Sequence, residues 1–413
     1  MAALRNRKMG NFLNLVYDGI DVSKQDIINY FQTYVGENNK LNFNFKVFEI
    51  DEIPSDGSKY YYFYEYRYYL APLIVSNQFL PFNEKVINLL KNNPDFYVII
   101  KNDAESDDDN LIESLDTLLK NIGIETKKFV VINCNERNND LKLRLNSDLI
   151  THTTNNGKFA IANELTRFPY NFKKERDFLF MSYNRKVKNH RFALLVYLMY
   201  HNVLHETDWS WMRGYELKEQ FLNSGGFQDF TPYLNQFFTK NEILKFEKEI
   251  LTLVDIEIKK SPYEKNYQVD YPPHTFDTEA SYSNNPYKNS YINIVTETNF
   301  DKNDIIILSE KSFIPLYFSQ IPIIMASTNH IKKMKDRYGF DFFEDVVDHS
   351  YDSEPNYKIR FEMIIDEVLR LNTKKQEIIS FFKNNKTRFD KNIEIFNEIK
   401  KDKEDFNFYN SLI

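Results

Sequence analysis

Short apolar runs alternate with segments of helical pattern along the first half of the chain. The runs are rich in β-branched and aromatic residues, which is typical of strands. They are FKVFEI (45–50), KYYYFYEYRYY (59–69), DFYVIIK (95–101) and KKFVVINCN (127–135). Residues 83–93, 109–123 and, more briefly, 136–146 carry apolar residues at helical spacing. Strands and helices that alternate in this way predict βαβ units and a parallel sheet.

The second half of the chain repeats this pattern. Residues 176–184 predict a strand and 188–202 a helix, and a polar region over 205–290 mixes helices with loops. The remaining predicted elements are strands over 291–297, 304–309 and 321–326, and helices near 310–318, 328–337 and 355–371. From Thr373 onward the pattern is that of one or two charged amphipathic helices.

The simplest division of the chain is therefore into two α/β halves that meet near residues 165–175. A length of 413 residues agrees with two or three ordinary domains. We expect one α/β domain over 1–168, a second over 169–372 and a helical segment over 373–413.

The composition limits the class of protein. With 42% hydrophobic and 27% charged residues, the chain is globular and wholesale disorder is excluded. The single cysteine, Cys134, excludes a disulfide framework and a cysteine-based zinc site. No apolar run has signal-peptide length at the start or reaches the roughly 18 residues of a membrane span. We expect a soluble cytoplasmic protein, and the net charge of −7 argues against a general nucleic-acid coat.

Several common chemistries lack their sequence motif. No GxGxxG follows a strand and no GxxxxGK[ST] occurs, so neither a conventional dinucleotide fingerprint nor a P-loop is present. HExxH and GxSxG are also missing. The seven histidines are scattered along the chain, so we expect no histidine-rich metal site.

Polar residues remain at the ends of predicted strands, where ligands bind in open α/β sheets. Asn184, Arg185, Lys188 and Arg191 lie where a strand gives way to a helix. Backbone N–H groups at a helix start, together with two guanidinium groups, suit a pyrophosphate. The alternative is a solvated basic helix start.

Two further polar positions follow the strands of the second half. Glu297 ends one predicted strand, although an isolated glutamate there is more often a surface residue. Ser309, Glu310 and Lys311 open a predicted helix, where the helix dipole favours the carboxylate and disfavours the ammonium group. Taken together, the cations suit phosphates and the carboxylates suit sugar hydroxyls, which points to a nucleotide sugar as ligand.

Three segments resemble a known family. FLFMSYNRKVKNHRFALLVYLM, YINIVTETNF and ILSEKSFIPLYFSQIPIIMAS resemble the donor-binding half of GT-B glycosyltransferases, in particular the fucosyltransferase-like branch and its relatives encoded by phages and large viruses. The resemblance covers roughly residues 176–370. Thr296, Thr298 and Gln320 depart from the residues typical of that branch, so the identity of the sugar does not follow from the resemblance.

The resemblance implies two Rossmann-like domains that face a central cleft, with carboxyl-terminal helices that cross back to the first domain. It implies that Lys311 and Arg185 contact the donor diphosphate, that Glu310 contacts the ribose or sugar, and that Glu297 braces the pocket. Transfer would be inverting and metal-independent, with no cofactor beyond the nucleotide-sugar co-substrate. The acceptor class stays open among a glycan, a protein, a lipid-linked sugar and a modified DNA base.

A carboxylate of the first domain would then deprotonate the acceptor hydroxyl. Asp103 and Glu105 follow a predicted buried strand and are the candidates, although the same stretch also has the pattern of an acidic helix cap. A GT-A enzyme that binds a metal through Asp107–Asp109 is a competing interpretation. A catalytically inactive sugar- or nucleotide-binding module of a virion or surface assembly is the non-enzymatic one. A nucleotide-sugar epimerase is disfavoured by the missing glycine fingerprint.

Overall fold

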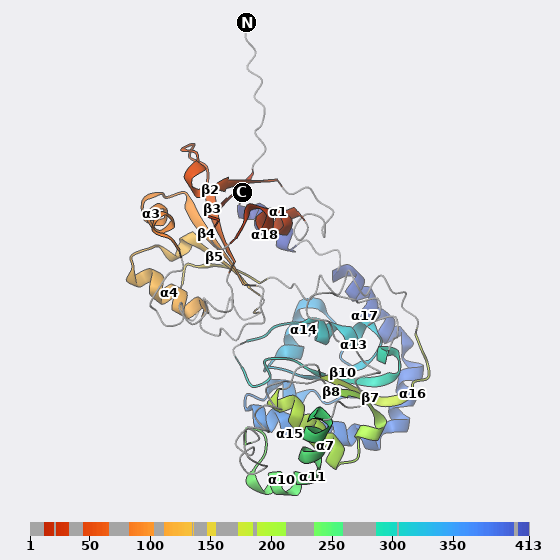
Figure 1. Ribbon diagram of the computed structural model, residues 1–413. Helices are drawn as coiled ribbons and strands as arrows, with labels where there is room; N and C mark the ends of the chain where they lie inside the picture. The colour runs from red at the N-terminus through yellow and green to blue at the C-terminus, as the bar shows by residue number, and fades with distance from the viewer. Residues whose placement is uncertain are drawn as a thin grey trace. The chain divides into compact units, whose positions relative to one another are not determined.

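The computed structural model divides the chain into two compact units, each built on a parallel sheet (Figure 1). Unit 1 comprises Met1–Asn156 and Lys401–Ile413, and unit 2 comprises Gly157–Lys400. The sequence predicts a boundary between the two domains at 168/169, and the two compact units divide at 156/157. The structure describes residues 12–19, 22–32, 44–65, 82–102, 111–133, 135, 147–153, 172–184, 188–211, 235–258, 286–303, 305–399 and 404–412.

Unit 1 contains a six-stranded sheet with the order β2-β1-β3-β4-β5-β6, and every neighbouring pair is parallel. Its strands are β1 (Leu13–Tyr17), β2 (Phe45–Glu49), β3 (Tyr60–Glu65), β4 (Phe96–Asn102), β5 (Phe129–Asn133) and β6 (Ile150–Thr153). Because β2 and β3 flank β1, the winding direction reverses between β1 and β3. Doubly wound sheets bind ligands outside the carboxyl ends of their strands at such a reversal.

Helices cover both faces of the unit 1 sheet. The first face packs on α3 (Glu84–Asn92) and α4 (Leu111–Asn121) through buried leucine and valine side chains. The second face packs on α1 (Lys24–Asn29) and on the last helix, α18 (Glu404–Leu412). α18 inserts Tyr409 and Leu412 into this core, and the Tyr61 hydroxyl donates to the Leu412 carbonyl at 2.9 Å. The end of the chain thus completes the core of unit 1.

Unit 2 contains a four-stranded parallel sheet with the order β10-β9-β7-β8. Its strands are β7 (Phe178–Asn184), β8 (Thr207–Trp211), β9 (Ser290–Thr296) and β10 (Ile321–Met325). Numbered within the unit, this order is 2-1-3-4, the same as the first four strands of unit 1. The reversal lies between β7 and β9.

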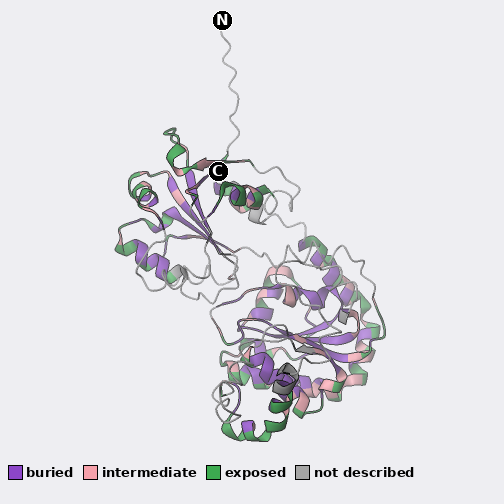
Figure 2. Ribbon diagram, viewed as in Figure 1, coloured by how far each residue is buried: buried purple, intermediate pink, exposed green. Residues whose placement is uncertain are grey.

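The helices of unit 2 enclose its sheet. α13 (Glu310–Tyr317), α14 (His330–Tyr338) and α17 (Lys386–Ile399) lie on one side. α7 (Asn189–Tyr200), α11 (Glu247–Ile258) and α15 (Tyr357–Thr373) lie on the other, next to α10 (Lys240–Lys245), while α16 (Lys375–Asn384) packs on β9. Figure 2 shows the strands of unit 2 mostly buried and the outer helix faces exposed. β9 and β10 are buried at every position, because a parallel sheet is covered on both faces.

Short turns complete the two units. Unit 1 contains 3-10 turns at η3 (Ile50–Glu52) and η5 (Thr126–Lys128). Unit 2 contains η6 (Leu204–Glu206), η8 (Pro286–Lys288) and η9 (Ser350–Ser353).

Most predicted elements are confirmed, with their ends moved by a few residues. The strand expected over 304–309 is wrong: among the described residues of that stretch only Ile307 makes a bridge, and the Ser309 N–H bonds back to the Ile307 carbonyl. Ile305, Ile306 and Leu308 are buried, but a continuous apolar run does not distinguish a strand from another buried segment. The helix expected over 136–146 lies outside the described residues. Strands β1, β6 and β8 were not predicted.

No helix within the described ranges combines the length and the apolar character that a membrane span requires.

We predict that Tyr409→Ala loosens unit 1. Tyr409 is buried, its ring lies 5.0 Å from that of Phe31, and its hydroxyl lies 2.9 Å from that of Tyr30. Truncation of a buried aromatic side chain costs about 3–5 kcal/mol. Hydrogen-exchange mass spectrometry of the full chain should show faster exchange in β1 and β4 and no change in β9. Tyr409→Phe, which keeps the ring, should cost about 1 kcal/mol. Unchanged exchange in β1 of the alanine variant would show that α18 does not support the sheet.

Candidate functional site

The carboxyl ends of β7 and β9 meet at the reversal of the unit 2 sheet. β7 ends at Asn184 and β9 ends at Thr296. The Thr296 hydroxyl donates to Asn184 Oδ1 at 2.8 Å, and Asn184 Nδ2 donates to the Ser182 hydroxyl at 3.1 Å. Asn184 is 1% exposed, so it ties the two strand ends together.

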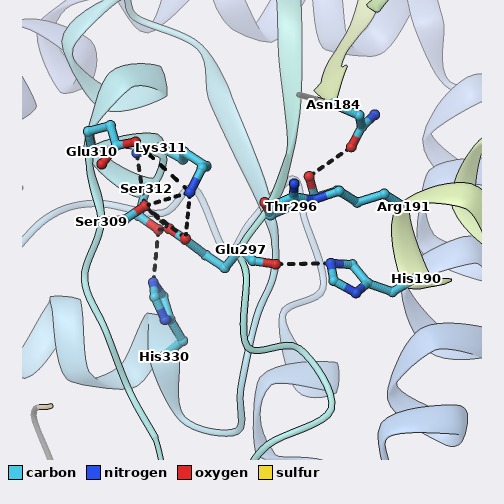
Figure 3. Close-up of polar contacts among 10 residues, drawn as sticks. All are labelled: Asn184, His190, Arg191, Thr296, Glu297, Ser309, Glu310, Lys311, Ser312 and His330. Carbon is cyan, nitrogen blue, oxygen red and sulfur yellow. Dashed lines mark hydrogen bonds and ion pairs between the residues drawn. The ribbon is translucent and has the colours of Figure 1, made fainter. Parts of the chain in front are cut away.

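The first turn of α7 fixes the exit of β9 (Figure 3). The His190 ring nitrogen Nε2 lies 2.9 Å from the Glu297 carbonyl, and Arg191 Nη2 donates to the Thr296 carbonyl at 3.0 Å. Both side chains are buried. Lys188 is the N-cap residue of α7, half-buried, and makes no side-chain cap hydrogen bond. Arg191 is therefore not solvated, since its side chain points inward and holds the backbone at the end of β9.

Glu297 lies at the centre of a buried polar network. The Ser309 hydroxyl donates to both carboxylate oxygens at 2.8 Å, and the Ser312 hydroxyl donates to Oε1 at 2.6 Å. The Ser312 oxygen also lies 2.8 Å from His330 Nε2. The Lys311 ammonium group lies 3.6 Å from Oε2. We refer to these five residues as the Glu297 network.

The serines belong to this network because of the way in which α13 begins. Ser309 is its N-cap residue and accepts from the Lys311 N–H at 3.2 Å. Ser312 is one turn further, so both hydroxyls face the same side. Pro315 lies inside this short helix, which ends beside Ser319 at a positive φ of 53°. The helix start is thus bonded directly to the carboxylate that ends β9.

Two charged side chains of this region reach the surface. The side chains of Lys311 and Glu310 are 30% and 29% exposed, whereas that of Glu297 is 6% exposed. Lys311 Nζ lies 3.9 Å from Glu310 Oε1. A lysine in the first turn of a helix is disfavoured by the helix dipole. The carboxylates of Glu297 and Glu310 offset this cost and hold the Lys311 ammonium group at the exposed edge of the network.

Burial disfavours the charged form of both buried histidines of this region. Burial, opposed by the nearby Asp352, lowers the pKa of His330 to about 4. Burial and the neighbouring Arg191 lower the pKa of His190 well below its usual range. The Ser312 hydroxyl has one hydrogen and donates it in a hydrogen bond to Glu297, so its oxygen must accept from His330. His330 therefore carries its ring hydrogen on Nε2. The hydrogen bonds of the network all run toward Glu297.

The structure brings seven of the predicted residues into this region: Asn184, Lys188, Arg191, Glu297, Ser309, Glu310 and Lys311. The alternative that Glu297 is a surface residue is wrong, because Glu297 is 5% exposed and three groups of the network contact its carboxylate. Arg185 lies outside the described residues.

Sequence reasoning missed Ser312, His330 and His190. No local signal marks the two histidines, which are 140 residues apart in the chain. A signal that could have found Ser312 is the Ser-x-x-Ser spacing at the start of an otherwise apolar helix.

In unit 1, the predicted carboxylates Asp103 and Glu105 lie outside the described residues, and so do Asp107–Asp109. The position equivalent to Asn184 is occupied by Asp18, which follows β1 at the reversal of that sheet. Its Oδ2 accepts from the Tyr62 hydroxyl at 2.9 Å and from Asn83 Nδ2 at 2.8 Å. Asp18 is half-buried and was not predicted from the sequence.

Among the described residues, no group of three or more histidine, cysteine, aspartate or glutamate side chains is arranged to hold a metal ion. No protein-family model matches the chain, and no curated protein or solved structure is detectably similar to it. The resemblance to GT-B glycosyltransferases therefore stays a prediction from the sequence.

We predict that the stability of unit 2 falls as the pH falls from about 6.5 toward about 4, because unfolding lets the buried His330 take up a proton. A pKa lowered on folding contributes stability that is full above the unfolded value of about 6.5 and is lost through the folded value. The loss should reach on the order of 2–3 kcal/mol. Asp352, whose pKa burial raises, acts in the opposite direction, and Lys311 adds to the effect.

The comparison of variants isolates His330 from these other groups. Urea unfolding at pH 7 and pH 4.5 should show a smaller loss of stability in His330→Gln than in the unchanged chain. His205→Gln, at an exposed histidine, is the control and should behave as the unchanged chain does. An equal loss in all three proteins would contradict a neutral, buried His330.

Proposed function

We propose that the chain is a nucleotide-sugar-dependent glycosyltransferase of the GT-B type and that unit 2 binds the donor at the Glu297 network. The observation that carries this proposal is the half-exposed Lys311 ammonium group, held by a buried carboxylate at the reversal of a parallel sheet. Ligands of doubly wound sheets bind at this position. The sequence resemblance gives the same residues to the donor.

The proposed division of labour follows from charge and exposure. The Lys311 ammonium group, together with the positive end of the α13 dipole, would stabilise the diphosphate, on which negative charge grows as it departs. Glu310, which is 29% exposed, would accept hydrogen bonds from the hydroxyls of the ribose or sugar. Asn184, Arg191 and Glu297 are too deeply buried to meet much of a ligand, so they would shape the pocket.

The proposed reaction is an inverting substitution at the anomeric carbon. A bond forms from the acceptor oxygen to this carbon, the bond to the diphosphate oxygen breaks, and the acceptor proton passes to a carboxylate of unit 1. Asp103 and Glu105 remain the sequence-based candidates for that base. Asp18 joins them, because its carboxylate is half-buried, is held by Tyr62 and Asn83, and lies at the ligand-binding edge of its sheet.

We predict that a nucleoside diphosphate or nucleotide sugar stabilises the chain against heat. Ligand at one hundred times its dissociation constant adds about 2.7 kcal/mol to the stability of the folded state. A thermal-shift panel of GDP, UDP and CDP with their sugar conjugates should therefore give one clear responder. No shift with any of them would contradict the proposed donor site.

Lys311→Ala should abolish binding of that responder without unfolding the chain. The substitution removes the half-exposed cation and keeps the N-cap at Ser309. Isothermal titration calorimetry measures the affinity, and far-ultraviolet circular dichroism measures the fold. Lys383→Ala is the matched control, because Lys383 also forms an ion pair in unit 2 but lies on α16. Unchanged affinity in the Lys311 variant would rule out its contact with the diphosphate.

A catalytically inactive binding module is the second candidate. It would bind the same nucleotide through Lys311 but would neither hydrolyse nor transfer the sugar. Chromatography of released nucleoside diphosphate, after incubation of the responding nucleotide sugar with the full chain and a mixed acceptor extract, separates the two functions.

A further inference from the structure

Ser312 and His330 have no exposed surface with which to meet a ligand. Ser312 is 0% and His330 is 1% exposed. Among the described residues, the hydrogen bonds of these two side chains lead inward, from His330 Nε2 to the Ser312 oxygen and from the Ser312 hydroxyl to Glu297 Oε1. Any effect of these two side chains on a bound molecule must therefore pass through Glu297.

The far end of this chain of hydrogen bonds is firmly anchored. His330 is the first residue of α14, and the Asp352 carboxylate accepts from the N–H groups of Ile331 and Lys332, both at 3.0 Å. The Asn329 N–H donates to the Asp352 carbonyl as well. Since the backbone on each side of His330 is bonded to Asp352, the start of α14 is held against η9, and the contact with Ser312 links the imidazole to α13.

At its other end, the chain of hydrogen bonds reaches the partly exposed Lys311 through Glu297. Ser309 and Ser312 together donate to both oxygens of Glu297, which leaves the carboxylate a single orientation. In that orientation Oε2 lies 3.6 Å from the Lys311 ammonium group, whose side chain is 30% exposed. A buried polar network is costly compared with an apolar core of the same volume, and its use is to hold one arrangement. Here the arrangement that it holds is the position of Lys311.

We propose that Ser312 and His330 are positioning residues of the donor site, which act through Glu297 to hold Lys311 where it meets the donor diphosphate. This inference rests on the proposed function of unit 2. Neither residue touches the donor. Loss of the Ser312 hydroxyl leaves Glu297 Oε1 and His330 Nε2 each without the partner that they share, so the carboxylate turns and Lys311 is released to solvent.

Calorimetry of the full chain with the best-binding member of GDP, UDP and CDP tests this inference. Ser312→Ala and His330→Leu should each weaken binding about tenfold. His330→Gln should bind within about threefold of the unchanged chain, because a glutamine amide restores an N–H donor. The pair of His330 variants carries the same test should Ser312→Ala not fold.

Two matched controls separate positioning from a general loss of packing. Ser290→Ala removes another fully buried hydroxyl, at the start of the same strand β9, whose oxygen has no hydrogen-bond partner among the described residues. His205→Leu removes an exposed histidine. Both variants should keep the affinity of the unchanged chain.

A double-mutant cycle tests the route through Glu297. Glu297→Gln alone should weaken binding, and adding Ser312→Ala to it should change the affinity less than about twofold, because the route is already broken. A full tenfold loss in the Glu297→Gln background would show a different route and overturn the inference.

The possible outcomes distinguish this inference from the proposed function. If the unchanged chain binds none of the diphosphates, the proposed function fails and the donor role of Ser312 and His330 fails with it. If the unchanged chain binds one and both Ser312→Ala and His330→Leu bind it equally well, the proposed function stands and only the positioning role is overturned.

Discussion

The hydrogen bonds that two serine hydroxyls donate to the Glu297 carboxylate hold the candidate site of unit 2 together. They join the end of β9 to the start of α13, and Ser312 extends the connection to α14 through His330. A buried carboxylate without such donors would be strongly destabilising. The short helix α13 begins at this point because the hydroxyl of its N-cap residue, Ser309, donates to the Glu297 carboxylate and also accepts from the Lys311 N–H. The position of the Lys311 side chain follows from this geometry, because Lys311 comes directly after Glu310 at the exposed side of the start of α13.

Both units carry their polar carboxyl-terminal edges at the same topological position. In unit 2 the reversal is marked by Asn184 and Glu297, and in unit 1 by Asp18. Unit 2 has a half-exposed ammonium group beside its buried carboxylate, and Asp18 accepts hydrogen bonds from a hydroxyl and an amide. The ammonium group is the feature on which the proposed diphosphate site rests.

The strong apolar runs made β7, β9, β10 and α7 predictable from the sequence, because most positions of each element are buried. β1 was missed although it lies in the middle of its sheet: LNLVY is only five residues long and has no clear boundary before it. The strand predicted at 304–309 was wrong because an apolar run also occurs in a buried segment that joins no sheet, as it does here.

The candidate site was predictable at its charged residues and not at its neutral ones. Glu297 and Lys311 stood out because charge at the end of an apolar strand is unusual. Ser312 and His330 did not, since they lie 15 and 33 residues after Glu297 and meet it only in the folded unit. Hydrogen-bond partners across such separations are set by the packing of α13 and α14, which no local pattern encodes.

A crystal structure of the full chain with the nucleoside diphosphate that binds best tests the central claim most directly. The account predicts a phosphate oxygen within about 3.2 Å of Lys311 Nζ, close to the start of α13, with Glu297 still bonded to Ser309 and Ser312. A diphosphate bound elsewhere on the chain, with Lys311 still turned toward Glu297 and remote from any phosphate, would contradict it.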